Sequence, residues 1–260
     1  MPPNHNPFSN AAKNLSVLDS DTIHQLRKGT KLLRARLQLL RLLGISTQQH
    51  DKLRNALRKL AHLLGGQRDS HVMYGLLKVL KSASQDASLE TLITDLQKSL
   101  EQNHLSSIEI KRIKDLLKSI EEVANPILEK PLPVTEMQEV LSKRLVSLCL
   151  NGDRQISGND WEALHAWRKQ VKKLMYQYGM KSAMTNRDQK IFATLDALGN
   201  SLGRINDLCI LERHIREREK NWTRAKTLSL FSQIYQMIDI QRKQALEQSK
   251  ALNKAILCER

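Results

Sequence analysis

Two short segments of the chain place a histidine and three cationic residues at helical spacing. Both follow the pattern HxxRKxxK, in which x is any residue; the residues are His24, Arg27, Lys28 and Lys31 in the first segment and His165, Arg168, Lys169 and Lys172 in the second. Lysine and arginine only donate hydrogen bonds, and arginine can hold two phosphate oxygens at once. A protonated histidine also donates from both ring nitrogens. These two signatures therefore indicate a binding site for an anion.

A second element recurs after each signature, in the same order. Leu64-Gly65 precedes Arg68-Asp69 in the first half of the chain, and Leu202-Gly203 precedes Asn206-Asp207 in the second half. Two matched elements in the same order indicate an internal duplication. The spacing between them differs by a few residues, which a shorter loop between helices would absorb. For the repeated aspartates, capping a helix or bracing an arginine is the simpler interpretation, and catalysis is the alternative.

Each signature lies on the polar side of an amphipathic helix. The expected buried positions of the first helix are Ile23, Leu26, Thr30, Leu33, Leu37 and Leu40, and those of the second are Trp161, Leu164, Trp167, Val171, Leu174 and Tyr178. At 100° per residue, the signature residues fall on a separate arc of about 120°. Arg34 joins the first arc and Lys173 joins the second. Both helices are thus predicted to carry a basic stripe away from the core.

The basic stripes are not balanced by acidic residues. No aspartate or glutamate lies between Lys28 and Arg41, or between His165 and Lys181. Like charges at these helical spacings cost a few tenths of a kcal/mol per pair, so a surface shaped only by stability would include glutamates. The first stripe extends about 25 Å at 1.5 Å per residue, which suits a long repeating anion. Arg54 and Arg58, on the polar side of the next helix, extend the cationic surface.

The spacing of apolar residues predicts an all-helical fold. The chain is 40% hydrophobic with only 4% aromatic residues, and leucine dominates. Such compositions favour helices packed on helices. Helices are predicted at about 21–43, 48–64, 68–82, 87–102, 106–124, 135–150, 160–180, 186–202, 204–220 and 223–256. Residues 1–18 are expected to form a flexible tail, and 19–260 to form one domain. Its first half covers about 19–124 and its second about 135–258, with a proline-rich linker at 125–134 and a loop at 151–160.

The charge of the chain bears on its partners and its location. The formal net charge is +15, which attracts phosphate chains, nucleic acids or anionic membranes. No apolar run is long enough to span a bilayer, and no secretory signal is expected. Cys149, Cys209 and Cys258 are widely spaced and odd in number, which favours reduced thiols in the cytoplasm.

Three alternatives to a simple polyanion-binding protein remain open at this stage. A nucleic-acid-binding protein fits the charge, although aromatic residues for base stacking are few. A phosphotransfer enzyme or phosphatase using His24 or His165 would need a metal or an acid–base partner, and no such constellation is visible. Binding at a membrane surface would need an exposed apolar face beside the stripes. We therefore expect no catalytic site, no metal and no cofactor.

The doubled HxxRKxxK pattern, each copy followed by Leu-Gly and an aspartate, resembles the CHAD family, the conserved histidine α-helical domain. The resemblance covers about residues 21–258. It implies two four-helix bundles related by pseudo-two-fold symmetry, with basic residues lining a central pore or groove. It also implies binding of inorganic polyphosphate by the residues of the two signatures, and location at polyphosphate granules. Met175 departs from the family pattern, in which the second signature often continues with arginine.

Overall fold

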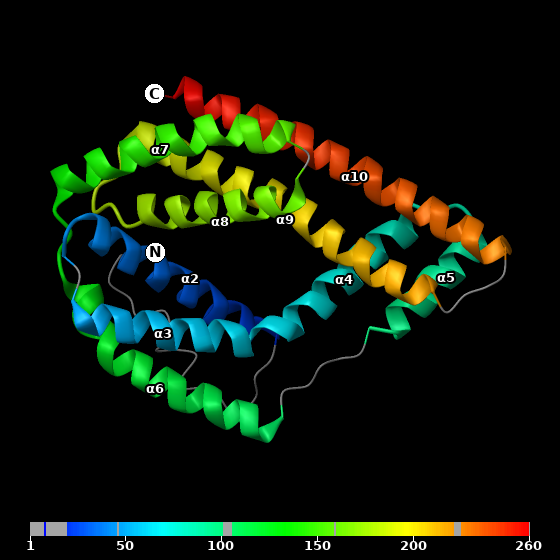
Figure 1. The fold of residues 1–260 in the computed structure, drawn as a ribbon, viewed down its shortest axis with the longest axis horizontal. Coiled ribbons are helices and arrows are strands. Elements are labelled where there is room, and N and C mark those ends of the chain that lie inside the picture. The colour runs from blue at the N-terminus through cyan, green and yellow to red at the C-terminus, as the bar shows by residue number, and fades with distance from the viewer. Residues whose placement is uncertain are drawn as a thin grey trace.

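The computed structural model describes Phe8 and residues 20–45, 47–100, 106–158, 160–220 and 225–259. Across these residues the fold is all-helical, as the sequence predicts (Figure 1). The helices are α2 (Ser20–Leu42), α3 (Gln48–Leu63), α4 (Gly65–Ser82), α5 (Ala87–Lys98), α6 (Ser107–Glu129), α7 (Val134–Ser157), α8 (Trp161–Tyr178), α9 (Asn186–Glu219) and α10 (Ala225–Cys258). The two signatures therefore lie on α2 and α8.

The buried apolar residues form three clusters. We call the first the α2–α3–α6 core, which also buries Phe8. The second, the α7–α8 core, adds the first half of α9 and the second half of α10. The third lies where α4 and α5 meet the remaining halves of α9 and α10. The long helices α9 and α10 run side by side and so connect the second cluster to the third (Figure 1).

Helix α2 packs into two of these cores at once. Its predicted seam, including Leu26 and Leu33, is buried in the α2–α3–α6 core. Ala35 and Leu39 instead lie in the α7–α8 core, so α2 lies beside α8 near the middle of the molecule (Figure 1). The buried amide of Gln177 on α8 donates a hydrogen bond of 3.0 Å to the carbonyl oxygen of Ala35. This contact joins the helices that carry the two signatures.

The end of α6 is fixed by an arginine of α2. Arg36 is only 4% exposed, and its guanidinium donates to the carbonyl oxygens of Ile127, Leu128 and Lys130 at 3.0, 2.9 and 2.6 Å. The last carbonyls of a helix have no partner within the helix, so these bonds satisfy them. Burial lowers the pKa of Arg36, and the three carbonyl oxygens offset the cost of placing its charge there.

The structure corrects the predicted linker. Helix α6 continues through Pro126 to Glu129, so the break before α7 is confined to residues 130–133, not 125–134. Ile127 and Leu128 are buried, and Arg36 binds the carbonyl oxygens after the proline, so packing outweighs the hydrogen bond that proline removes. The pseudo-two-fold relation of the two halves stays a prediction.

Other boundaries are also corrected. The predicted loop at 151–160 is helical as far as Ser157, and α9 is one helix where two were predicted. Gly65, which lies between the helices predicted at 48–64 and 68–82, begins α4. Gly152 and Gly203 lie inside these helices, and side chains of α8 pack closely against both glycines. Of the predicted tail at 1–18, only Phe8 lies within the described residues, and it is fully buried.

Gly152 shows why α7 needs a glycine. The ring of Trp167 lies against its Cα, and the indole nitrogen donates to the carbonyl oxygen of Leu148 at 3.1 Å. A Cβ at Gly152 would overlap Cζ2 of Trp167 and lie 2.9 Å from Oδ1 of Asn253. Helices α7, α8 and α10 therefore approach one another closely at this point.

We expect Gly152→Ala to lower the free energy of unfolding by about 1–3 kcal/mol, as overpacking a core does. Urea titration followed by circular dichroism measures this change. The matched control is Gly75→Ala on α4, where a Cβ meets no atom within 4 Å. The control should be neutral or slightly stabilising, because alanine favours helix over glycine. Equal effects of the two substitutions would contradict the packing described for Gly152.

Candidate anion-binding site

The predicted site residues divide by their exposure. Seven are exposed, namely His24, Lys28, Lys31, Arg34, Arg54, Arg58 and Lys169, and five are partly buried, namely Arg27, His165, Arg168, Lys172 and Lys173. The partly buried residues contact other helices, whereas the exposed ones present their charge to solvent. The signatures therefore combine residues that position helices with residues that can meet a ligand.

The arginine of the first signature joins α2 to the junction of α3 and α4. Nη1 of Arg27 donates a hydrogen bond to the carbonyl oxygen of Leu64 and a longer one, of 3.4 Å, to the carbonyl oxygen of Gly65. Leu64 caps the C-terminal end of α3, where backbone oxygens lack partners and a cation is favoured. Arg27 thus has a role in positioning the two helices.

The arginine and the last lysine of the second signature lie across glycines of α9. A Cβ at Gly203 would lie 3.1 Å from Nη2 of Arg168, and one at Gly199 would lie 2.6 Å from Cε of Lys172. The ammonium of Lys172 binds Oδ1 of Asp196 at 2.8 Å and Oδ1 of Asn200 at 2.7 Å. Lys172 is thus committed to an ion pair within the protein.

Both signature arginines contact the repeated Leu-Gly element of their own half. Arg27 binds the backbone at Leu64-Gly65, and Arg168 lies against Gly203. The pattern HxxRKxxK and the later Leu-Gly are thus two sides of one contact in each half. Of the repeated aspartates, Asp207 is described, whereas the side chain of Asp69 lies outside the described residues.

The two signature histidines differ in environment. His24 is exposed, whereas His165 is partly buried and its Nδ1 has no hydrogen-bond partner among the described residues. Burial lowers the pKa of His165, and the charges of Lys169 and Arg168 lower it further, while Asn206 and Asp207 on α9 act in the opposite direction. The neutral form is therefore favoured at neutral pH in the protein without a ligand.

A cavity of about 210 Å³ brings together four of the predicted residues, from three helices. Arg34 comes from α2, Arg54 and Arg58 come from α3, and Lys173 comes from α8; the other residues that line this cavity, which we call the cationic pocket, are Leu37, Gln38, Arg41, His50 and Asp51. The two basic stripes thus meet at Arg34 and Lys173. No described contact joins the histidine ends of the stripes.

Positive charge in the pocket is poorly compensated. Among the described lining residues the one acid is Asp51, which already pairs with Arg54 at 3.0 Å. Burial lowers the pKa of Lys173, and the charges of Arg144 and Arg34 lower it further. Arg144, on α7, has a buried Nε with no hydrogen-bond partner among the described residues. A cluster of cations with few acids is a surface suited to an anion.

Sequence reasoning missed two residues of this region, His50 and Arg144. His50 is the third residue of α3, and its Nδ1 accepts a hydrogen bond from the backbone nitrogen of Thr47 at 3.2 Å. Burial and then the charge of Lys130 lower its pKa, whereas Asp51 raises it. A threonine three residues before His50 was the available signal, since capping boxes have this spacing. Nothing in the sequence placed α7, and hence Arg144, beside Lys173.

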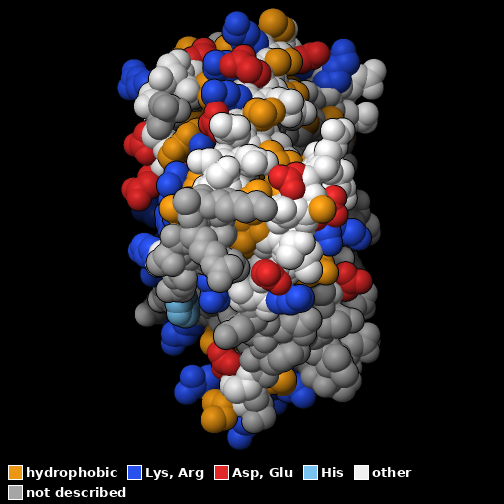
Figure 2. Space-filling view, turned by 90° about the vertical axis from the view of Figure 1, so that its right-hand side faces the viewer, with side chains coloured by type: hydrophobic (Ala, Val, Ile, Leu, Met, Phe, Trp, Pro, Cys, Tyr) orange, Lys and Arg blue, Asp and Glu red, His pale blue; other side chains and the backbone are white. Residues whose placement is uncertain are grey.

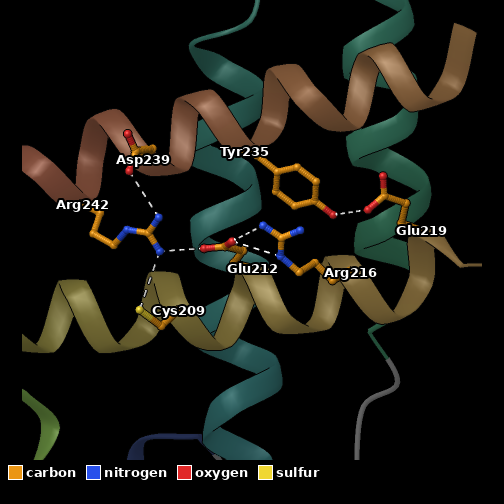
Figure 3. A network of polar contacts seen from close by, with 7 residues as sticks. All are labelled: Cys209, Glu212, Arg216, Glu219, Tyr235, Asp239 and Arg242. Carbon is orange, nitrogen blue, oxygen red and sulfur yellow. Dashed lines mark hydrogen bonds and ion pairs between the residues drawn. The ribbon is translucent and has the colours of Figure 1, made fainter. Parts of the chain in front are cut away.

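The arginines between α9 and α10 have acidic partners. Between α9 and α10, Glu212 pairs with both Arg216 and Arg242 at 2.6 Å (Figure 3). Tyr235 donates to Glu219 at 2.6 Å in the same network (Figure 3). The face of the molecule toward the α5 end likewise mixes basic and acidic side chains (Figure 2). This network differs from the cationic pocket, where one aspartate lies among several cations.

In the part of the chain that the structure describes, no three histidine, cysteine, aspartate or glutamate side chains are grouped so that they could hold a metal ion. None of the described helices combines the length and the apolar character needed to cross a membrane.

Comparison with known proteins identifies relatives by sequence and by fold. The family model described as "CHAD domain" matches residues 9–216. The structure is similar to the crystal structure of the CHAD domain from the plant Ricinus communis, with a TM-score of 0.59 and 17% sequence identity over 97% of this chain and 86% of that one. No curated protein matches the chain.

The buried histidines predict how stability depends on pH. Burial lowers the folded-state pKa of His50, His165 and His214 below the unfolded value of about 6.5. Their contribution is therefore present above that value and lost as the pH falls through and below it. We expect the free energy of unfolding, from urea titrations at pH 7.5, 6.5 and 5.5, to decrease toward pH 5.5.

His165→Gln should flatten part of this dependence, because it removes one histidine whose folded-state pKa is lowered. A slope that is the same in the wild type and in His165→Gln would contradict the assignment of a lowered pKa to His165.

Proposed function

The chain belongs to the CHAD domain family, and from this premise we propose that it binds inorganic polyphosphate and does not hydrolyse it. The family is associated with polyphosphate binding, and the residues that carry the resemblance are the two basic signatures. We further propose that the protein acts in the cytoplasm, at polyphosphate granules.

The observation that carries this proposal is the cationic pocket. Arg34, Arg58 and Lys173 come from three helices and line one opening, although they lie far apart in the sequence. Each buried or crowded cation raises the energy of the folded protein unless an anion is present. A polyanion would offset this repulsion by bringing several negative oxygens to the same place.

The contacts divide the signature residues into two roles. Exposed residues and those of the pocket would touch the polyphosphate; they are His24, Lys28, Lys31, Arg34, Arg54, Arg58, Lys169 and Lys173. Arg27, Arg168 and Lys172 are positioning residues, because they bind the α3–α4 junction and the glycine face of α9. His165, partly buried beside Lys169, would gain a proton when an anion raises its pKa.

The arrangement also predicts a preference for long chains. The exposed residues of α2 extend beyond the pocket over several turns, and α8 adds Lys169 on a second helix. A ligand held at one end binds the remaining cations at high effective concentration, which raises the overall affinity well above that of either contact alone. A long polyphosphate can reach the exposed residues of both helices beyond the pocket, whereas a short one cannot.

Nucleic acid is the second candidate, and two contacts weigh against it. Trp167 is buried in the α7–α8 core, and the ring of Trp161 is covered by the guanidinium of Arg242 at 4.8 Å from its centroid. Neither ring is therefore open for stacking with a base, which is the usual source of affinity for single strands. Polyphosphate needs no such platform.

We expect Lys28→Glu with Lys169→Glu to weaken binding of long-chain polyphosphate at least about tenfold. Each substitution removes a charge-assisted hydrogen bond and adds repulsion, and 1.4 kcal/mol corresponds to a factor of ten. Fluorescence anisotropy of labelled polyphosphate at fixed salt measures the affinity. Both lysines are exposed, so the thermal midpoint should change little.

The matched control is Lys118→Glu with Lys254→Glu, at exposed positions of α6 and α10. It changes the net charge equally and should lower the affinity less than threefold. Competition by DNA, RNA and ATP at equal phosphate concentration completes the test. An equal loss in the control, or displacement by DNA as effective as by polyphosphate, would show a diffuse cation with no polyphosphate site.

A further inference from the structure

The cationic pocket has no equivalent in the second half of the chain. Counting from the two signature histidines, Arg34 matches Met175 and Lys173 matches Leu32. Counting from the two Leu-Gly elements, Arg54 matches Phe192 and Arg58 matches Asp196. Every one of these cations is therefore replaced by an apolar or an acidic residue at the matching position.

Packing also fills the matching place in the second half. Met175 is buried in the α7–α8 core, and Leu32 and Phe192 pack against the same core. Asp196 is used by the ion pair with Lys172. The residue that matches His50 is Asp188, which pairs with Lys181 at 2.6 Å with both side chains almost fully buried. At the positions that match these cations, apolar packing and ion pairs therefore stand in place of a cationic cavity.

The size of the cavity limits what it can hold. About 210 Å³ is the liquid volume of about seven water molecules, enough for a few phosphate groups but not for a long chain. Arg34, Arg54 and Arg58 each offer a planar fork that can take two oxygens of one phosphate group. Lys173 of α8 and Arg41 of α2 add further positive charge to the lining.

We propose that the cationic pocket is a single subsite for a compact triphosphate group, one per chain, formed by α2 and α3 of the first half together with Lys173 of α8. Resting on the proposed function, the pocket would hold the end of a polyphosphate chain while the rest of the chain follows the exposed residues of α2 and α8. A nucleoside triphosphate presents the same chemistry, and its base and sugar would project from the opening. A chain end and a nucleotide therefore compete for the same residues.

Isothermal titration calorimetry with inorganic tripolyphosphate tests the subsite. We expect a stoichiometry of one per chain and at least a tenfold loss of affinity in Arg34→Gln with Arg58→Gln. The control, Lys118→Gln with Lys254→Gln, should stay within twofold of the wild type. Arg34→Lys with Arg58→Lys keeps the charge and should show an intermediate loss, because lysine lacks the fork. The thermal midpoints of all variants show that they are folded.

The same variants titrated with long-chain polyphosphate separate this proposal from the proposed function. The Gln variant should lose less affinity for the long chain, which keeps its contacts with Lys28 and Lys169. Displacement of tripolyphosphate by ATP would assign the site to triphosphates in general, and no displacement would assign it to chain ends. Tripolyphosphate binding that is unchanged in the Gln variant, or that has two sites per chain, would overturn the subsite while long-chain binding stands. Absence of binding by both ligands would overturn both proposals.

Discussion

The position of α2 between two cores is the constraint on which the rest of the structure depends. One side of the helix is buried with α3 and α6 through residues such as Leu33, and another side is buried beside α8 through Ala35 and Leu39. At 100° per residue, an arc of about 120° between these two buried sides is left for solvent, and it holds His24, Arg27, Lys31 and Arg34. The basic stripe therefore occupies the part of the α2 surface that neither core covers. The contact between α2 and α8 places Arg34 near Lys173.

This arrangement has an electrostatic cost that the protein does not offset with its own acids. Burial and neighbouring cations lower the pKa of Lys173, and Arg144 has a buried nitrogen without a described partner. In contrast, Glu212 on α9 lies between two arginines, so the charges there balance (Figure 3). Positive charge is thus paired with acids between α9 and α10, where it holds two helices together. It is largely unpaired in the cationic pocket, where a ligand would bind. A bound anion would relieve the repulsion between these cations, and this relief would favour binding.

Much of this could be predicted from the sequence, because helices reveal their buried faces through spacing. The seam from Ile23 to Leu40 on α2 was confirmed, since every predicted position there is buried. The second buried side of α2 was missed, although Leu32, Ala35 and Leu39 also follow helical spacing. A single sequence offers no sign that one helix must serve two cores, because that depends on how distant helices pack. The two signatures and the two Leu-Gly elements could be recognised in the sequence. The sequence did not show that Arg27 and Lys172 make contacts that hold helices together.

Glycines were the main source of error, and for one physical reason. Gly152 and Gly203 suggested breaks, yet each lies inside a helix against a large side chain from α8, namely Trp167 or Arg168. A missing Cβ permits a turn and also permits close approach, and local sequence does not distinguish the two. The same contacts determine which signature residues are left to bind a ligand.

The most direct measurement is a crystal structure of the protein with a polyphosphate of defined length, long enough to reach from the cationic pocket to Lys169. We expect phosphate groups within hydrogen-bonding distance of Arg34, Arg58 and Lys173 together, and further phosphates of the same chain beside Lys28 or Lys169. Polyphosphate that follows one helix only, or that lies on α6 or α10 and leaves the pocket empty, would contradict the joint use of the two signature helices.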